Sequence, residues 1–281
     1  MKGFINLYKP KGMSSAQAVA SVKRQLNLNN EKVGHAGTLD PLASGILPIC
    51  VGRATRLFDY MLSKEKTYIA EFTFGYETNT IDAEGEVIHT STKIPTKEEI
   101  EKILPSFLGE IEQIPPQFSA KSIDGKRAYE NARKGKIMQL KPCKVIVKDF
   151  VVLEQKSRTT FTFRITCGSG TYIRSLARDV GHKLSTYATM TNLQRVKSGV
   201  FSLDNCVQLI DVSRDSILPC EVVLDKLEKI DLSEQHEKLL LQGKSYHENY
   251  NDGIFRAYVD KELIGLLEIK NSLPKMKVWL K

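Results

Sequence analysis

The sequence has few of the residues from which metal centres and disulfide frameworks are built. Only five cysteines occur in 281 residues, no two of them form a CxxC pair, and the five histidines show no HxxxH or similar spacing. An odd number of widely separated cysteines argues against a disulfide framework and against a four-cysteine zinc site. We therefore expect reduced, mostly buried thiols, and neither a metal nor another cofactor.

Long apolar runs are also missing. No segment approaches the roughly 20 apolar residues that span a bilayer. The N-terminal stretch, Met-Lys-Gly-Phe-Ile-Asn-Leu-Tyr-Lys-Pro, lacks the apolar core and cleavage site of a signal peptide. We expect a cytoplasmic protein without membrane contact, and nothing in the sequence requires an assembly larger than a monomer. The length predicts one large domain with an appendage, or two domains.

Positive charge is plentiful but concentrated. The net charge is +8, and residues 121–148 contain nine Lys or Arg against two acids, Asp124 and Glu130. Residues 231–281 contain eight acids and eight bases and are therefore neutral. A concentrated basic segment is typical of a protein that binds a polyanion such as nucleic acid. On charge alone, a solvated loop without a ligand explains the segment equally well.

The hydrophobic periodicity predicts an α+β fold: a large mixed, mainly antiparallel sheet flanked by helices, and a small β-rich C-terminal domain. We place the domain boundary near residue 230, with a main domain over 1–230 and a tail module over 231–281. The strands predicted in the main domain cover residues 3–9, 45–51, 66–75, 86–90, 145–153, 159–167 and 187–203. The helices predicted there cover residues 16–27, 54–62, 96–108, 128–133 and 171–184. In the tail we expect a helix over 233–241 and strands over 255–259, 263–269 and 277–280.

Three local patterns make these expectations specific. In 66–75, Tyr68, Ala70, Phe72 and Phe74 alternate and should share one buried face. In the helix over 16–27, Ser14 or Ser15 caps the start, and the buried stripe should comprise Ala16, Val19, Val22 and Leu26. Pro48 should make 45–51 an edge strand or interrupt it, because proline cannot donate to a ladder.

Residues 34–45, Gly-His-Ala-Gly-Thr-Leu-Asp-Pro-Leu-Ala-Ser-Gly, combine three glycines and a proline in twelve residues. This composition predicts a tight, ordered loop that fixes His35, Thr38 and Asp40. An aspartate between Leu39 and Pro41 has two explanations. It can cap local N–H groups in an Asx turn, which spacing alone favours, or it can supply a catalytic carboxylate.

Five stretches, in order, carry a resemblance to a known family. They are Leu7 to Ser15 (LYKPKGMSS), Gly34 to Gly45 (GHAGTLDPLASG), Lys66-Thr67-Tyr68 with Thr78 to Gly85 (TNTIDAEG), Pro115 to Lys121 (PPQFSAK) with Tyr129, Ala132, Arg133 and Gly135, and Gly168 to Leu176 (GSGTYIRSL). Together they make residues 3–200 similar to the TruB family of pseudouridine synthases. A single stretch is a moderate signal, whereas all five in the same order make coincidence improbable.

The resemblance implies the pseudouridine synthase fold with a shortened PUA-type module at the C-terminus. It implies isomerisation of one uridine, position 55, in the T loop of tRNA, with the tRNA T stem-loop as partner and no cofactor or metal. The neutral tail departs from what an RNA-gripping PUA domain suggests.

The resemblance also assigns roles near the chemistry. Asp40 becomes the nucleophile, a task that suits a carboxylate. Arg174 lies against Asp40, and Tyr68 stacks on the target base while its hydroxyl assists proton transfer. Position alone would make Arg174 a helix-surface arginine and Tyr68 one more core aromatic.

Further residues are assigned to binding. The substrate-binding set is Lys9, His35, Asp82, Tyr172 and Leu193. Among them, His35 would insert into the space left when the uridine is extruded, although a lone histidine is more often structural. The RNA-gripping insertion covers about residues 115–148, and its candidate RNA-binding residues are Lys121, Lys126, Arg127, Arg133 and Lys134.

Two other functions are compatible with parts of the sequence. A non-catalytic tRNA-binding protein or RNA chaperone could use the same fold, but it would not need Asp40, Tyr68 and Arg174 together. A hydrolase with a carboxylate nucleophile would need a partner carboxylate at a recognisable site and would gain nothing from the basic segment. The sequence leaves open whether Asp40 attacks the base or the sugar.

Overall fold

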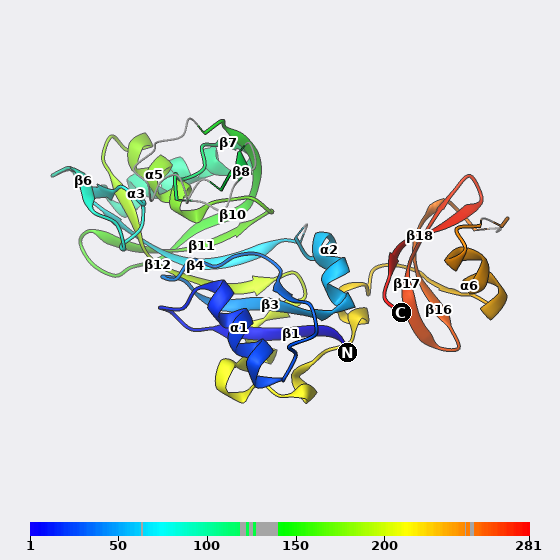
Figure 1. The fold of residues 1–281 in the computed structure, drawn as a ribbon. Helices are drawn as coiled ribbons and strands as arrows, with labels where there is room; N and C mark the ends of the chain where they lie inside the picture. The colour runs from blue at the N-terminus through cyan, green and yellow to red at the C-terminus, as the bar shows by residue number, and fades with distance from the viewer. Residues whose placement is uncertain (63, 119–121, 124–125, 128–139, 245, 248–249) are drawn as a thin grey trace.

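The computed structural model describes residues 1–62, 64–118, 122–123, 126–127, 140–244, 246–247 and 250–281. Among these residues, ten strands form one long sheet and four more form a separate C-terminal sheet (Figure 1). The path through the long sheet is β14-β1-β3-β12-β4-β11-β10-β7, with β13 paired to β12 and β2 paired to β3. The segments of the long sheet that carry the candidate site residues thus meet near its centre.

The bounds of the elements follow the predicted order. The strands of the long sheet are β1 (Lys2–Lys9), β2 (Val33–His35), β3 (Ser44–Gly52), β4 (Lys66–Phe74), β7 (Gly109–Gln113), β10 (Cys143–Gln155), β11 (Thr160–Cys167), β12 (Ala188–Ser198), β13 (Phe201–Ser202) and β14 (Val207–Gln208). Two small hairpins are β5 (Tyr76–Thr78) with β6 (Val87–Thr90), and β8 (Ser122–Ile123) with β9 (Lys126–Arg127). The helices are α1 (Ser15–Gln25), α2 (Phe58–Leu62), α3 (Lys97–Ile103), α5 (Ile173–Lys183) and α6 (Glu234–Leu241). The C-terminal strands are β15 (Lys229–Asp231), β16 (Gly253–Val259), β17 (Glu262–Lys270) and β18 (Leu273–Trp279).

Most neighbours in the long sheet are antiparallel. The exceptions are β1 with β14 and β3 with β12, which run parallel. The fold is therefore α+β with a mixed, mainly antiparallel sheet, and the predicted fold class is confirmed. The predicted segments missed most strands of two to five residues, because such short strands carry little readable alternation. The exceptions are β6, expected at 86–90, and β13, which falls within 187–203.

The centre of the long sheet is the pair β4 and β12. Along β4, Tyr68, Ala70, Phe72 and Phe74 are buried and the intervening residues are half-buried, as the alternation predicted. The ring centroids of Phe72 and Phe163 lie 4.7 Å apart, so strand β11 contributes to the same core. Helix α5 packs its apolar side, from Ile173 to Leu184, into this cluster. The core thus fixes the sheet and α5 relative to each other.

Helix α1 corrects one detail of the sequence analysis. Ser14 is the N-cap and accepts a hydrogen bond from the Gln17 N–H, in a capping box. Ala16 is exposed, so its predicted place in the buried stripe was wrong. The buried positions are Ser15, Ala18 and Val22, because the helix turns Ser15 inward to make hydrogen bonds. The polar Ser15 takes the inner position expected for Ala16, while Val22 and Leu26 are buried as predicted.

Pro48 also differs from expectation. It lies within the nine-residue strand β3, which is an inner strand of the sheet. The Pro48 carbonyl accepts a hydrogen bond from the Ala36 N–H at 2.8 Å. Since the N and O of one residue face the same side of an antiparallel strand, the missing N–H faces the Ala36 segment and leaves the β1 ladder intact. The prediction that Pro48 makes an edge or an interruption was wrong for this reason.

The C-terminal sheet lies to one side of the long sheet, close to the N-terminus (Figure 1). An apolar cluster joins the two sheets and includes Phe4 and Leu57 from the main domain and Leu266 and Leu280 from the tail. Polar contacts add to it: the Lys2 Nζ donates to Glu262 at 3.1 Å. The tail therefore packs against the first strand of the main domain.

The basic segment falls largely outside the described residues. Lys121, Arg133, Lys134 and the helix predicted over 128–133 lie outside them, while Lys126 and Arg127 form strand β9. No described helix combines the length and apolar character needed to cross a bilayer.

Two glycines with positive φ provide a test of how closely β3 and β12 approach. A Cβ on Gly45 would lie 2.3 Å from the Arg195 carbonyl oxygen, whereas a Cβ on Gly12 would meet nothing within 4 Å. Their φ angles are +105° and +84°. We expect Gly12→Ala to cost about 1–2 kcal/mol of unfolding free energy through backbone strain, and Gly45→Ala to cost about 1–3 kcal/mol more through overpacking.

Urea-induced unfolding of the two variants, followed by circular dichroism, measures this difference. Gly12→Ala serves as the matched control, because it shares the positive φ and lacks the collision. Equal losses in the two variants would contradict the close approach.

Candidate active site

The loop within residues 34–45 is shorter than the sequence suggested. Its first two residues belong to β2, and its last two begin β3. Gly37 has a φ of +106°, a conformation that favours glycine, and so permits the turn between the two strands. The loop proper therefore covers residues 36–43 and carries Asp40 near its middle.

Helix α1 holds this loop in place. The Ser15 hydroxyl donates to the Leu39 carbonyl at 2.9 Å and accepts from the Leu39 N–H at 2.8 Å. The Gly12 N–H donates to the Pro41 carbonyl at 2.8 Å. The backbone on both sides of Asp40 is thus bonded, which fixes the direction of its side chain.

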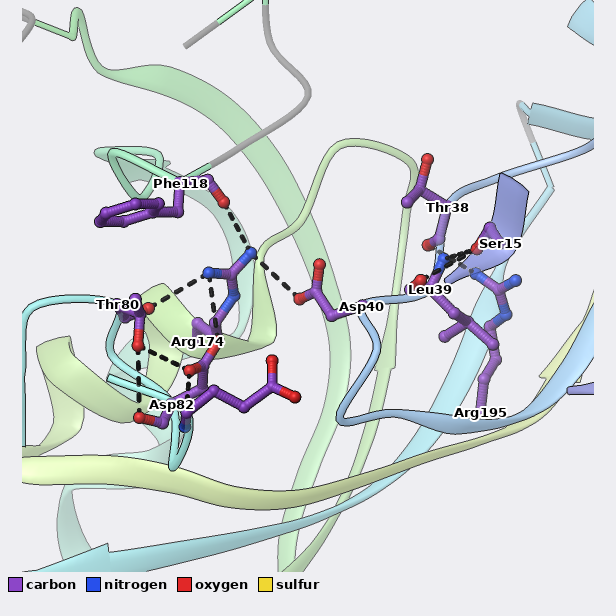
Figure 2. Close-up of polar contacts among 10 residues, drawn as sticks. Ser15, Thr38, Leu39, Asp40, Thr80, Asp82, Phe118, Arg174 and Arg195 are labelled. Atoms are coloured by element: carbon purple, nitrogen blue, oxygen red, sulfur yellow. Dashed lines mark hydrogen bonds and ion pairs between the residues drawn. The ribbon is translucent and has the colours of Figure 1, made fainter. Parts of the chain in front are cut away.

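The Asp40 carboxylate faces Arg174. Its Oδ2 lies 3.0 Å from the Arg174 Nη2, and Figure 2 shows the two side chains reaching toward each other from the loop and from the first turn of α5. The Arg174 side chain is 7% exposed and the Asp40 side chain 32%. The alternative of a helix-surface arginine is thereby excluded.

Three further groups hold the guanidinium. It donates to the Thr80 carbonyl at 3.1 Å and to the Phe118 carbonyl at 2.9 Å. On the side away from Asp40, its Nη1 lies 3.4 Å from the Asp82 Oδ2 (Figure 2). Asp82 in turn accepts from the Thr80 hydroxyl at 2.6 Å and from the Glu84 N–H at 3.1 Å. Arg174 is therefore clamped between two carboxylates, of which Asp40 is the more exposed and Asp82 is buried.

The start of α5 is fixed by an amide side chain. Tyr172 is the N-cap and makes no side-chain cap. Instead, its N–H donates to the Gln113 Oε1 at 2.8 Å, and its carbonyl accepts from the Gln113 Nε2 at 3.1 Å. The Ser175 hydroxyl donates to the Ile114 carbonyl at 2.8 Å. These bonds hold the turn that carries Arg174 against strand β7.

Burial and the neighbouring charge act on Asp40 in opposite directions. Burial raises the pKa of the Asp40 carboxyl above its ordinary value, and the Arg174 guanidinium opposes that rise. Asp82 adds a further raising effect. The arginine is therefore the group that favours the ionised, nucleophilic form of Asp40.

Asp40 and Arg174 lie in the wall of a pocket of about 230 Å³. Pockets for drug-sized ligands measure about 300–1,000 Å³, so this one suits a smaller group such as a single nucleobase. Of the predicted site residues, the pocket wall contains Asp40, Tyr68, Tyr172, Arg174 and Leu193. Lys66 and Arg195 also lie in the wall.

Three predicted site residues do not line this pocket. Lys9 is fully buried, and its Nζ donates to the Pro10 and Met13 carbonyls at 2.9 and 2.6 Å. Burial lowers the pKa of Lys9 to about 8, and the charge of Asp40 opposes that lowering. His35 lies on β2, and its Nδ1 is buried without a hydrogen-bond partner among the described residues. Asp82 lies behind Arg174 and reaches the site only through it.

The sequence analysis missed Arg195 and Lys66. Strand alternation could have found both: Lys66 lies two residues before Tyr68, and Arg195 lies two residues after Leu193. Arg195 is in register with Tyr68 across the β4–β12 pair. Burial lowers the pKa of Lys66 to about 8, and the Arg195 charge adds to that lowering.

Within the described part of the chain, no group of three His, Cys, Asp or Glu residues could hold a metal ion. The pocket wall combines a carboxylate, two phenols, two guanidinium groups, an ammonium group and apolar side chains. Such a set offers nucleophilic and proton-transfer chemistry on a small planar ligand.

Comparison with known proteins agrees with this geometry. The family model described as "TruB family pseudouridylate synthase (N terminal domain)" matches residues 23–173, and that described as "tRNA pseudouridylate synthase B C-terminal domain" matches residues 174–228. The chain is 39% identical over 278 residues to the tRNA pseudouridine synthase B of Clostridium kluyveri, covering 95% of each protein. It is 40% identical over 281 residues to that of Zymomonas mobilis, covering 96% of this chain and 92% of the relative.

Solved structures share the fold. A chain of a Cbf5-Nop10-Gar1 complex superposes with a TM-score of 0.71 at 26% identity, covering 99% of this chain and 84% of that one. A chain of an archaeal box H/ACA sRNP Nop10-Cbf5 complex gives a TM-score of 0.71 at 25% identity, with 99% and 86% coverage. Fold and family models together define the class as a pseudouridylate synthase. Within that class, the chain belongs to the TruB family.

The clamp around Arg174 gives a prediction for the pKa of Asp40. Arg174→Gln removes the nearby positive charge and leaves the burial, so the pKa of Asp40 should rise further, by about 1–3. Carbon-13 NMR of aspartate-labelled protein, titrated with pH, measures it. Arg178→Gln is the matched control, because Arg178 lies one turn later on α5 and pairs with Asp179. An unchanged Asp40 pKa in Arg174→Gln would contradict the electrostatic role given to Arg174.

Proposed function

We propose that this protein isomerises uridine to pseudouridine at position 55 in the T loop of tRNA. The observation that carries the proposal is a small pocket in a TruB-family chain whose wall combines Asp40, Arg174 and Tyr68. The reaction breaks the N1–C1′ bond, rotates the uracil and forms a C5–C1′ bond. The C5 proton is lost and N1 gains one, so no oxidant or other co-reactant is consumed.

Asp40 is the proposed nucleophile. A carboxylate held by the backbone on both sides can attack and later depart with little rearrangement of the protein. Its ion pair with Arg174 supports this role, because the guanidinium opposes the rise that burial causes in the pKa of the carboxyl and so favours its charged form. Asp82 supports Arg174 from behind, and its proposed contribution is therefore to the orientation of the guanidinium.

Tyr68 and Leu193 are the proposed contacts of the uracil ring. Both are nearly fully buried, and they lie on neighbouring strands in the pocket wall. An aromatic ring and an apolar side chain suit the two faces of a planar base, and the Tyr68 hydroxyl is available for proton transfer. Tyr172, at the start of α5, completes the wall beside Arg174. We infer that the base rotates within this space while its ring stays covered.

The uridine must leave its RNA stack to reach Asp40, at a cost of a few kcal/mol. We propose that His35 and Lys9 act at this stage. His35 lies on the strand that precedes the catalytic loop and has a ring nitrogen without a protein partner among the described residues. Because Nδ1 is buried, the RNA contact proposed for His35 uses the rest of the half-buried ring. Lys9 lies beneath the loop and stabilises the turn at Pro10 to Met13.

The remaining features are consistent with a tRNA partner. We propose a catalytic domain over residues 1–230, an RNA-gripping insertion over about 115–148 and a short PUA-like domain over 231–281. We further propose that the protein acts as a monomer in the cytoplasm, without a metal. The neutral charge of the tail indicates a smaller share of RNA affinity for that domain than for the insertion.

The decisive experiment uses unmodified tRNA labelled with tritium at uridine C5. Incubation with the purified protein, without added metal or cofactor, should release the label, because C5 exchanges its hydrogen for the C1′ bond. Asp40→Asn should reduce the release to background while leaving tRNA binding measurable. A labelled tRNA in which another base replaces the uridine at position 55 should release no label, although its other uridines are labelled.

Asp59→Asn is the control, since Asp59 is an exposed aspartate on α2. It should release the label at the wild-type rate. Binding without release by the wild-type protein would point instead to an RNA chaperone. Full release by Asp40→Asn would exclude the proposed nucleophile.

The insertion gives a separate prediction. Replacement of its basic residues Lys126, Arg127, Arg133 and Lys134 by glutamine should weaken tRNA binding and flatten its salt dependence. The slope of log K against log salt should fall by about 0.7–0.9 for each phosphate group that the variant no longer neutralises. The single-turnover rate at saturating enzyme should change much less than the affinity.

Filter binding across a series of salt concentrations measures the affinity and the slope. Replacement of Lys97 and Lys102 by glutamine is the control, because both lie on α3 outside the insertion. An insertion variant with unchanged affinity and slope would contradict the RNA-gripping role.

A further inference from the structure

Arg195 is a buried cation that the proposed chemistry does not use. It lies on β12 and is 1% exposed, the largest fully buried side chain in the described part of the chain. No described carboxylate forms an ion pair with it. Burying a charge without a counter-ion is costly unless hydrogen bonds compensate. The hydrogen bonds of Arg195 therefore indicate its role in the protein.

Those bonds go to both ends of the catalytic loop. The Arg195 Nη2 donates to the Gly37 carbonyl at 2.9 Å, and Nη1 lies 3.4 Å from the Thr38 carbonyl. Nε donates to the Ile46 carbonyl on β3 at 2.7 Å. Figure 2 shows the guanidinium beside Thr38 and Leu39, on the opposite side of the loop from Arg174. One planar group thus ties the strand after the loop to the residues just before Asp40.

Arg195 also contacts Tyr68. The two residues are directly opposite in the β4–β12 register, which places their side chains on one face of the sheet. Burial raises the pKa of the Tyr68 hydroxyl, and the nearby Arg195 charge opposes that rise. Both residues, with Asp40, lie in the wall of the same pocket. Arg195 is therefore hydrogen-bonded to the loop that carries Asp40 and lies directly opposite Tyr68.

We propose that Arg195 is a positioning residue for the isomerisation: its guanidinium sets the distance and direction between the loop that carries Asp40 and the hydroxyl of Tyr68. This inference rests on the function proposed above. Arg195 acts through these two groups and does not touch the substrate.

Alternatively, Arg195 could serve only the stability of the fold. The two roles predict different effects when the Arg195 side chain is truncated. Loss of a stabilising arginine lowers the free energy of unfolding and leaves the chemical step intact in the molecules that remain folded. Loss of a positioning arginine slows the chemical step, because a displacement of about 1 Å in a reacting group can cost roughly 100-fold in rate.

The burial also explains why lysine should replace Arg195 only in part. A guanidinium donates in one plane to several acceptors, and these are the carbonyls of Gly37, Thr38 and Ile46 here. An ammonium keeps the charge but cannot reproduce the planar fork. Arg195→Lys should retain the fold and part of the geometry, which makes it the informative variant if Arg195→Met unfolds.

The test measures single-turnover conversion of tRNA at saturating enzyme, together with the tRNA dissociation constant. Arg195→Met should lower the rate about 100-fold, and Arg195→Lys should lower it by about 10-fold, while both keep tRNA affinity within about twofold because Arg195 makes no RNA contact. A double-mutant cycle with Tyr68→Phe should be non-additive, since both changes disturb the same hydroxyl.

Arg164→Met is the control, because Arg164 is an exposed arginine on β11, which is separated from β12 by β4. This variant should convert tRNA at the wild-type rate. A wild-type rate in Arg195→Lys, or additive effects with Tyr68→Phe, would overturn the proposal. If the wild-type protein itself converted no uridine, the proposed function would fail, whereas activity in the wild type with unchanged Arg195 variants would refute this inference alone.

Discussion

The structure depends on one guanidinium held between two carboxylates. Arg174 is nearly buried and lies between Asp82, which is fixed by its own turn, and Asp40, which faces the pocket. A buried arginine without partners would be costly, and an isolated Asp40 would be driven toward its neutral form. The ion pair reduces both costs, because Asp40 compensates the buried charge of Arg174 and that charge opposes the rise that burial causes in the pKa of Asp40.

This clamp draws together distant parts of the chain. Asp40 comes from the loop before β3, Arg174 from α5, Asp82 from the β5–β6 connection, and the Phe118 carbonyl from the start of the insertion. The phenylalanine-rich core beneath β4 and β12 supplies the rigid base on which these segments meet. Preorganised polar groups over such a base perform best when little has to move during the reaction. The proposed role of Arg195 extends the same principle to the opposite side of the loop.

Much of the fold could be predicted from the sequence, and the reasons are local. Alternation revealed β4 and its buried face, and the capping serine revealed the start of α1. Ala16 was misplaced because an inward-facing serine breaks the apolar rule. The motif resemblance named Asp40, Tyr68 and Arg174, which the structure brings into one pocket wall, and their roles stay predictions.

Other features could not be read from the sequence, since they arise from tertiary contacts. Asp82 was expected to bind substrate, but its position behind Arg174 depends on a hairpin that folds back over α5. Gln113 and Arg195 bond to backbone groups about 60 and 160 residues away, and no periodicity encodes such partners. From sequence patterns, it is easier to predict which residues are buried than which residues contact each other.

A crystal structure of the Asp40→Asn protein with a T stem-loop hairpin tests the central claim most directly. The account predicts one uridine extruded from the hairpin, its ring against Tyr68 and Leu193, and its reacting carbon about 3–3.5 Å from the side chain at position 40. A hairpin bound with every base stacked, or seated away from the pocket that Arg174 and position 40 share, would contradict it.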